Sequence, residues 1–302
     1  MRNHALSVLE ELAKDRPNII LINGDLGFGV IDNFSQKYPE RSINAGISEQ
    51  NMMGVAAGMA LCGGIVYVYS IGNFPGMRCL EQIRNDVCYP NANVKIMAVG
   101  GGFSYGQLGM SHHATEDIAI MRALPGMHIF SPADPIDAEY AVRESAAIDG
   151  PCYIRLGKGR EPSLPNPHAG PVRKIFDGDR VAIIATGPII KEALEARAIL
   201  EEKKISAAVY DIVQLKPVPI ELDEILQEYD VIVTLEEHNI IGGLGSIVSE
   251  ELSKTSKITT LTRIGLKDTF TSIVGDQSYL RKYYGMSSTD IVKAIEDSLN
   301  RR

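Results

Sequence analysis

The stretch GISEQNMMGVAAGMA, residues 46–60, decides how the rest of the chain can be arranged. Ser48 can cap a helix, Glu49 falls in its first turn, and small and large apolar residues alternate behind it. Such a helix suits burial against another backbone or a flat ligand, because its glycines and alanines add little bulk. Residues 42–46 predict a strand tip and a turn, so Glu49 lies at a strand-to-helix junction, where α/β sheets bind ligands. Alternatively, Glu49 only stabilises the positive end of the helix.

Outward from this helix, apolar runs alternate with segments of helical periodicity. In the first half, strands are expected at 19–23, 65–69 and 94–99, and helices at 77–88, 115–126 and 135–148. In the second half, strands are expected at 181–185, 207–211, 230–235 and 258–263, helices at 189–202, 219–227 and 243–252, and two more helices within 278–299. This alternation predicts two α/β domains, residues 1–160 and 176–302. Residues 161–175 contain four prolines and predict an extended linker.

Composition and net charge limit the class of protein to which the chain can belong. The 302 residues are 45% hydrophobic and 23% charged, which is ordinary for a globular chain of two domains. A net charge of −8 without long runs of like charge argues against nucleic acid or a membrane surface as the partner. The cysteines form no CxxC pair and lie in or beside apolar segments, so reduced thiols are expected at positions 62, 79, 88 and 152. With no apolar leader and no run of 18 apolar residues, we expect a cytoplasmic protein without a membrane span.

Further candidate side chains follow the predicted strands at their carboxyl ends. Asp25 lies in a turn after strand 19–23, where it is either a ligand contact or a turn former. Phe74 lies in a glycine- and proline-containing loop, where it could stack on a flat heterocycle or plug the loop onto the core. Residues 100–114 contain five glycines and end in the pair His112 and His113, which are either substrate contacts or braces of the loop.

These segments together resemble the transketolase family of thiamine-diphosphate enzymes. The GISEQ segment and its small-residue helix are similar to the part of the family that meets the aminopyrimidine of the cofactor, and Glu49 matches the acid bonded to its N1′ nitrogen. The resemblance implies that Asp25 lies near the cofactor and that Phe74, or a neighbour, stacks on the pyrimidine ring. Ser111 and His112 stand where the family has a Thr-His pair. The resemblance implies that His112 makes a catalytic contact with substrate oxygens and that His113 lies beside it.

The resemblance also bears on the substrate. Arg155 and Lys158 lie on the strand that closes the first domain, where the family carries an arginine toward substrate phosphate. Lys158 is nearer that position, although a solvated loop lysine would look the same. Two residues depart from the family. Leu108 replaces an acid that reads donor-sugar hydroxyls, and Gly100 falls where transketolases place a phosphate-binding histidine, so the standard pentose phosphates are not implied.

One element of a complete thiamine enzyme is missing from the sequence. We find no Gly-Asp-Gly followed some thirty residues later by Asn, the motif with which the family holds the divalent metal on the diphosphate. The resemblance therefore covers only the later portion of a full transketolase. It implies that an N-terminal transketolase subunit supplies the diphosphate site and Mg²⁺ (or Ca²⁺), and that the chain forms a dimer within an α2β2 heterotetramer and provides no metal ligand itself.

The expected function is that of a thiamine-diphosphate-dependent transketolase subunit, a transferase moving a two-carbon glycolaldehyde unit between sugars only when its partner is present. A β subunit of an oxo-acid dehydrogenase and a deoxyxylulose-phosphate-synthase-like enzyme are alternatives, because Leu108 leaves both open. A non-catalytic assembly subunit is the third possibility.

Overall fold

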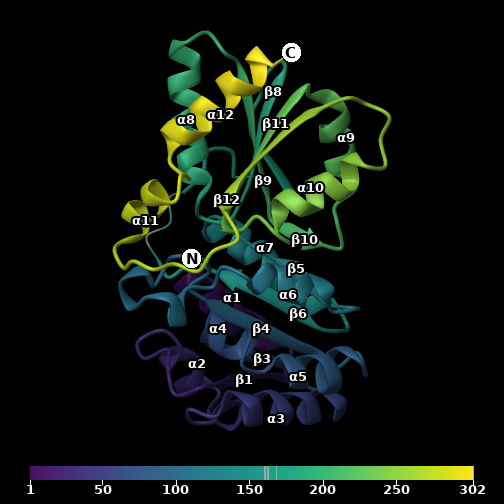
Figure 1. The fold of residues 1–302 in the computed structure, drawn as a ribbon. Helices are drawn as coiled ribbons and strands as arrows, with labels where there is room; N and C mark the ends of the chain where they lie inside the picture. Colours follow the sequence, from purple (N-terminus) through teal and green to yellow (C-terminus); the bar gives the residue numbers. More distant parts are fainter. Residues whose placement is uncertain (160, 162, 168, 302) are drawn as a thin grey trace.

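The computed structural model describes residues 1–159, 161, 163–167 and 169–301. The chain folds into two α/β domains, one above the other in Figure 1, each built on its own sheet. The two α/β domains expected from the sequence are thereby confirmed. Within the described residues, no helix is both long and apolar enough to cross a bilayer.

The first sheet has the strand order β10-β5-β6-β4-β3-β1-β2. All its pairs are parallel except the one between β10 and β5. Its central strands are buried on both faces, as their continuous apolar runs require. The strands are β1 (Ile19–Asn23), β2 (Ser42–Asn44), β3 (Ile65–Ile71), β4 (Val94–Val99), β5 (His128–Phe130), β6 (Cys152–Leu156) and β10 (Gln214–Lys216).

Helices cover both faces of the first sheet. On one face, α1 (Arg2–Asp15) and α7 (Pro135–Ala147) pack together over the buried Tyr67 and Met97. On the other face lies α3 (Glu49–Leu61), whose methionines and alanines contact Val66, Val68 and Ile96. The shorter helical segments are α2 (Asp32–Lys37), η1 (Pro39–Arg41), α4 (Asn73–Gly76), α5 (Leu80–Gln82), the π-helical η2 (Ile83–Cys88), the 3₁₀ turns η3 (Gly106–Leu108) and η4 (Met110–His112), and α6 (Asp117–Ala123).

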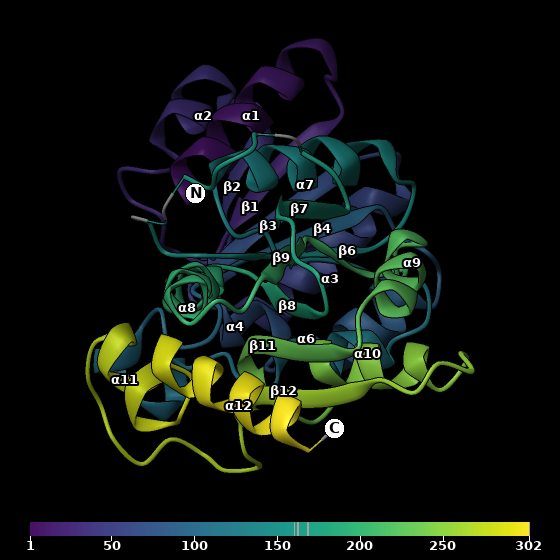
Figure 2. The ribbon, with the colours of Figure 1, turned by 90° about the horizontal axis from the view of Figure 1, so that it is seen from above.

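The second sheet has the order β12-β11-β8-β9-β7 and is parallel except for its β7 edge. Figures 1 and 2 show α8 and α12 on one face of this sheet and α9 and α10 on the other. Its elements are β7 (Val172–Phe176), β8 (Val181–Thr186), α8 (Ile190–Glu202), β9 (Ala207–Ile212), α9 (Glu221–Glu228), β11 (Val231–Asn239), α10 (Leu244–Leu252), β12 (Thr260–Leu266), α11 (Gln277–Tyr283) and α12 (Ser288–Asn300).

Three features differ from the expectations. The helix expected at 77–88 is instead α5 followed by π-helical η2, and Phe74 lies in the short helix α4 and not in a loop. The expected linker ends in strand β7, although its residues 162 and 168 lie outside the described residues. Strand β10 follows the second domain's β9 but pairs with β5 of the first domain, so the two sheets share a boundary that the apolar pattern does not reveal.

Candidate functional site

The sequence-predicted side chains gather along one edge of the first sheet. Asp25 follows β1, Glu49 follows β2, Phe74 follows β3, His112 follows β4 and Lys158 follows β6. Because these strands are parallel, their carboxyl ends meet at the same edge, where α/β proteins place ligands. The chain therefore brings together residues that are up to 133 positions apart, Asp25 and Lys158 being the outermost pair (158 − 25).

Glu49 is the first residue of α3, and its carboxylate is buried, with a side-chain exposure of 2%. Its ion-pair partner among the described residues is Arg78, whose Nη1 lies 2.7 Å from Oε2 of Glu49. Gly24 lies close by, since a Cβ added there would come within 3.7 Å of the Glu49 Cγ. Ser48 is the N-cap residue, as expected, but its side chain makes no capping hydrogen bond.

The Arg78 guanidinium also lies over the Phe74 ring, 4.6 Å from its centroid. Phe74 in turn meets the His112 ring edge to face, with the centroids 5.3 Å apart. The side chains of Glu49, Arg78, Phe74 and His112 therefore form a continuous series of contacts. Nothing in the sequence marked Arg78 as part of it, because the pairing depends on how α4 and α5 fold over the end of β3.

Asp25 lies at the exposed end of this group. Its backbone has a φ of 56°, a left-handed conformation that Asp tolerates. Its carboxylate accepts a hydrogen bond from the Asn44 side-chain amide at 2.9 Å, and its own N–H donates to the Asn44 Oδ1 at 3.1 Å. Asp25 thus forms the turn that was one of its two expected roles, while its neighbour Gly24 contacts Glu49.

The two adjacent histidines point in different directions. His112 is half-buried, with its Nδ1 3.1 Å from the Ser111 hydroxyl, and its ring faces Phe74. His113 is buried, and both its ring nitrogens are bonded inside the protein, to the Thr271 hydroxyl at 2.6 Å and the Gly106 carbonyl at 3.2 Å. The sequence-based assignment of His113 to substrate binding is corrected accordingly, because its ring is fully engaged away from the site.

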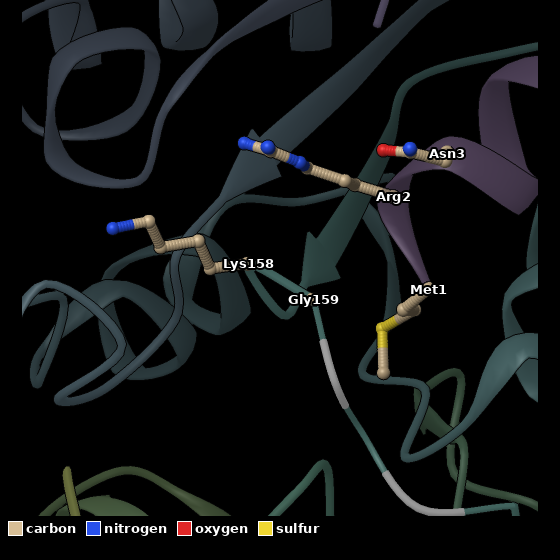
Figure 3. A pocket seen from close by; sticks show the side chains of 5 residues that line it. All are labelled: Met1, Arg2, Asn3, Lys158 and Gly159. Atoms are coloured by element: carbon tan, nitrogen blue, oxygen red, sulfur yellow. The ribbon is translucent and has the colours of Figure 1, made fainter.

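Lys158 lines a cavity of about 620 Å³ together with Met1, Arg2, Asn3 and Gly159. Figure 3 shows the Arg2 and Lys158 side chains, which come from α1 and from the segment after β6, extending into the same space. The Lys158 ammonium lies 4.5 Å from the centroid of the Tyr105 ring. Arg2 was missed in the sequence, although a cation in the first turn of a helix opposes the helix dipole and so hints at another role.

Arg155 does not reach this site, which corrects its assignment as a substrate contact. The side chain is buried, and its Nε donates to Asp117 Oδ2 at 2.8 Å. Its Nη2 donates to the carbonyls of Ala114 at 2.8 Å and Glu237 at 3.0 Å. Arg155 is therefore an internal connection between the domains, and Lys158, in the segment after β6, is the cation that lines the cavity.

Two further buried groups lie at the domain boundary. Burial raises the pKa of Glu236 to about 7, although the amides of Gly245 and Leu244 donate to its carboxylate and oppose the shift. Burial lowers the pKa of His238 to about 4, so its ring is neutral at pH 7. Its Nε2 accepts from the Ala119 amide and its Nδ1 donates to the Asn239 carbonyl, so it serves as a brace outside the site.

The residues present fit the aminopyrimidine that the resemblance implies. Arg78 is itself a flat group with N–H donors, and it bonds Glu49 while lying over Phe74. A flat nitrogen heterocycle that stacks on Phe74 and bonds Glu49 would use the same two groups. Among the described residues, no cluster of three or more His, Cys, Asp or Glu side chains is arranged to hold a metal ion.

Comparisons with known proteins agree with this geometry. The family description "Transketolase, pyrimidine binding domain" matches residues 1–162, and "Transketolase, C-terminal domain" matches residues 170–291. A "Putative transketolase C-terminal section" of Methanocaldococcus jannaschii is 39% identical over 308 residues, covering 100% of this chain and 96% of the relative. A subunit of the apulose-4-phosphate transketolase of Actinobacillus succinogenes is 33% identical over 264 residues, covering 86% of this chain and 85% of the relative.

Among solved structures, one described as "Split gene transketolase, inactive beta4 tetramer" superposes with a TM-score of 0.90 at 38% identity, covering 99% of this chain and 98% of the other. The fold and the site define a two-domain α/β protein whose ligand edge carries a buried acid beside an aromatic ring. The chain belongs to the transketolase family, and it is similar to proteins that are themselves a separate C-terminal portion or subunit.

Proposed function

We propose that this chain is the pyrimidine-binding subunit of a two-subunit, thiamine-diphosphate-dependent transketolase that transfers a two-carbon ketol unit between sugars. The observation that carries the proposal is the group formed by Glu49, Arg78 and Phe74. A buried acid whose ion-pair partner is a half-exposed arginine can exchange that partner for a ligand nitrogen without unfolding the helix around it.

The chain's own residues have distinct tasks in this reaction. Thiamine diphosphate, when bound, supplies the carbanion chemistry. Glu49 holds or returns a proton at the pyrimidine N1′, where burial strengthens the interaction, and Phe74 orients the ring. His112 packs against the Phe74 ring and positions a substrate oxygen by donating or accepting one proton.

The cavity lined by Arg2 and Lys158 supports an inference about the charge of the substrate. Arg2 and Lys158 bring two cations to a space of about 620 Å³ whose lining includes no acidic side chain among the described residues. We therefore infer an anionic ketose as donor, carrying a phosphate or sulfonate that Arg2 can bind through its planar fork and Lys158 as a point charge. The relative named for apulose 4-phosphate is consistent with a phosphorylated sugar.

The partner is proposed to dock beside α3. Apolar side chains are uncovered along this helix and just before it, namely Ile47, which is 77% exposed, Val55 and Leu61. A Cβ added at Gly54 or Gly58 would meet nothing within 4 Å, so another backbone can approach there. We infer that an N-terminal transketolase subunit carrying the diphosphate and Mg²⁺ site covers this face, in an α2β2 assembly in the cytoplasm. The relative described as an inactive β4 tetramer supports self-association without activity when that partner is missing.

The test is reconstitution. The purified chain is mixed with the diphosphate-binding subunit of the same source, thiamine diphosphate and Mg²⁺, and assayed on phosphorylated ketoses, free ketoses and 2-oxo acids. We expect ketol transfer from phosphorylated or sulfonated ketoses by the mixture and none by either component alone. Turnover of 2-oxo acids without ketol transfer would favour the dehydrogenase or synthase alternatives, and no turnover of either class would favour the assembly role.

A further inference from the structure

The loop that carries His112 is closed at its base by the first domain. It spans residues 100–114 between β4 and α6. The Gly102 amide donates to the Ala114 carbonyl at 2.8 Å, and the Ala114 amide donates to the Gly102 carbonyl at 3.1 Å. These bonds bring the two ends of the loop together. Near His112 itself, the first domain meets the loop through Phe74 and through Asn73 of α4, whose amide donates to the Ser111 carbonyl at 3.5 Å and to the His113 carbonyl at 2.5 Å. The loop has further contacts in the second domain.

The second domain holds the start of this loop through hydrogen bonds to Glu237 of β11. Its Oε1 accepts from the Phe103 amide at 2.5 Å and from the Gln277 side chain at 2.8 Å, and its Oε2 accepts from Arg281. Gly102 has a φ of 62°, and a Cβ there would lie 2.5 Å from Oε1 of Glu237. The carboxylate therefore lies directly against the loop backbone, at a position where only glycine leaves room for it.

A second contact fastens the end of the loop. The Thr271 hydroxyl lies 2.6 Å from His113 Nδ1, and His113 Nε2 lies 3.2 Å from the Gly106 carbonyl. A carbonyl only accepts, so Nε2 carries the proton and Nδ1 accepts from Thr271. Burial lowers the pKa of His113, which keeps the ring in this neutral form. The Gly275 amide donates to the same Gly106 carbonyl at 3.4 Å.

With both ends held, the direction of His112 is fixed. His113 points into the second domain, and its neighbour His112 faces the Phe74 ring instead, 5.3 Å between centroids. We propose that the second domain acts as a clamp on loop 100–114, with Glu237 and Thr271 as positioning residues that hold His112 against the site. This rests on the proposed function for the catalytic part, whereas the clamp itself is a property of the isolated chain.

The test compares loop mobility in variants of the full chain. Hydrogen exchange is measured on peptides covering 100–114 in wild type, Glu237→Ala and the matched control Glu250→Ala. Glu250 pairs with Arg122 at 2.6 Å and so also joins the two domains, but through α10 and α6, on the opposite side from α11 in Figure 1. We expect hydrogen exchange of the loop to become about 10- to 100-fold faster in Glu237→Ala, because the variant loses a hydrogen bond to a charged acceptor. In Glu250→Ala we expect the exchange rate of the loop to stay unchanged.

Thr271→Val, with Thr262→Val as its control, tests the clamp with a mild change of shape. Thr262 bonds Ser298 at 3.0 Å, away from the loop. We expect about 10-fold faster loop exchange in Thr271→Val only. In the reconstituted complex, Thr271→Val and Glu237→Ala should lower kcat by about tenfold or more while the KM for thiamine diphosphate is kept. Glu237→Gln should recover part of the loss, because its amide oxygen can still accept from Phe103 while its NH2 group offers no acceptor to Arg281.

The proposal would be overturned by loop exchange that stays at the wild-type rate in both Glu237→Ala and Thr271→Val, or by faster loop exchange with unchanged kcat. Equal effects in the control variants would also overturn it, since they would reflect general loosening of the domains. A wild-type complex without any activity would refute the proposed function and with it the catalytic part, while the exchange comparison would still decide whether the second domain holds the loop.

Discussion

Arg78 and Glu49 are bonded at 2.7 Å, yet their side chains differ sharply in exposure, at 46% and 2% respectively. The acid is anchored in the protein and the base reaches it from solvent. This asymmetry means that Arg78 can move out into solvent, whereas Glu49 cannot, and a ligand that bonds Glu49 must take the place of Arg78.

Arg78→Ala should therefore raise the affinity of the isolated chain for thiamine. A half-exposed ion pair contributes roughly 1 kcal/mol or less, so the gain is about fivefold. Isothermal titration with thiamine measures it. Arg84→Ala is the control, because the Arg84 side chain bonds only its neighbour Asn85 among the hydrogen bonds of the described residues. Weaker thiamine binding by Arg78→Ala would instead make Arg78 a ligand contact.

Glu49→Gln should lower turnover of the reconstituted complex by about 10²–10⁴-fold, because an amide cannot move the proton at N1′. The fold should survive, since Gln retains an acceptor for Arg78. Deuterium exchange at the thiazolium C2 is the direct measurement. Glu81→Gln, an exposed acid on α5, serves as the control and should behave as wild type. Wild-type C2 exchange in Glu49→Gln would remove Glu49 from the activation step.

Substitutions of the two histidines should have different effects, on activity for His112 and on stability for His113. His112→Ala should lower turnover by about 10²–10⁴-fold and leave C2 exchange and cofactor affinity intact, because its ring contacts Phe74 at the site and hydrogen-bonds the neighbouring Ser111. His113→Ala should lower the free energy of unfolding by about 1–3 kcal/mol, because it removes the ring that bonds Thr271 and the Gly106 carbonyl. Urea unfolding and turnover on both variants test this. A stable but inactive His113→Ala protein would show that His113 acts in the site.

The pair Arg155 and Asp117 should behave as a buried structural ion pair. Arg155→Met leaves Asp117 with the Tyr153 hydroxyl, which donates to Oδ2 at 2.8 Å, as the hydrogen-bond donor to its carboxylate among the described residues. We expect the free energy of unfolding to fall by about 3–5 kcal/mol. In contrast, Lys158→Met should leave stability unchanged and raise the KM for an anionic ketose. An Arg155→Met protein of normal stability with a raised KM would restore its role in substrate binding.

Much of this site could be predicted because parallel strands end at one edge. Once the apolar runs were assigned to strands, Glu49, Phe74, His112 and Lys158 had to lie near one another. Side-chain direction could not be predicted in the same way. Arg155 and Lys158 differ by three positions on one segment, and Arg155 turns inward because Asp117 and the carbonyls of Ala114 and Glu237 accept its hydrogen bonds there.

The same limit applies to contacts between the domains. Strand β10 is three residues long and has no periodicity, so its pairing with β5 depends on how the second domain is placed. The contacts of Arg78 and Glu237 depend on elements far apart in the sequence. Local pattern thus predicts which elements form and where their ends lie, while the polar connections that fix individual side chains require the packed structure.

The pH dependence of stability should reveal the buried pair of titrating groups at the domain boundary. The pKa of Glu236 is raised to about 7, so the folded state binds its proton more tightly than the unfolded chain, and this stabilisation is lost as pH rises from about 4.5 to 7. The pKa of His238 is lowered to about 4, so the folded state loses stability as pH falls from about 6.5 to 4. Each contributes about 3 kcal/mol across its window, with opposite signs.

In the wild-type chain the two contributions should nearly cancel between pH 4.5 and 6.5. Glu236→Gln removes one of them, so the free energy of unfolding of this variant should rise with pH across that window, by up to about 3 kcal/mol relative to the wild-type curve. Urea unfolding at several pH values measures the slope, which is unaffected by any uniform loss from the weaker acceptors offered to Leu244 and Gly245. Parallel curves for the two proteins would show that Glu236 does not titrate in this range, and a falling curve for Glu236→Gln would show that His238 does not resist protonation.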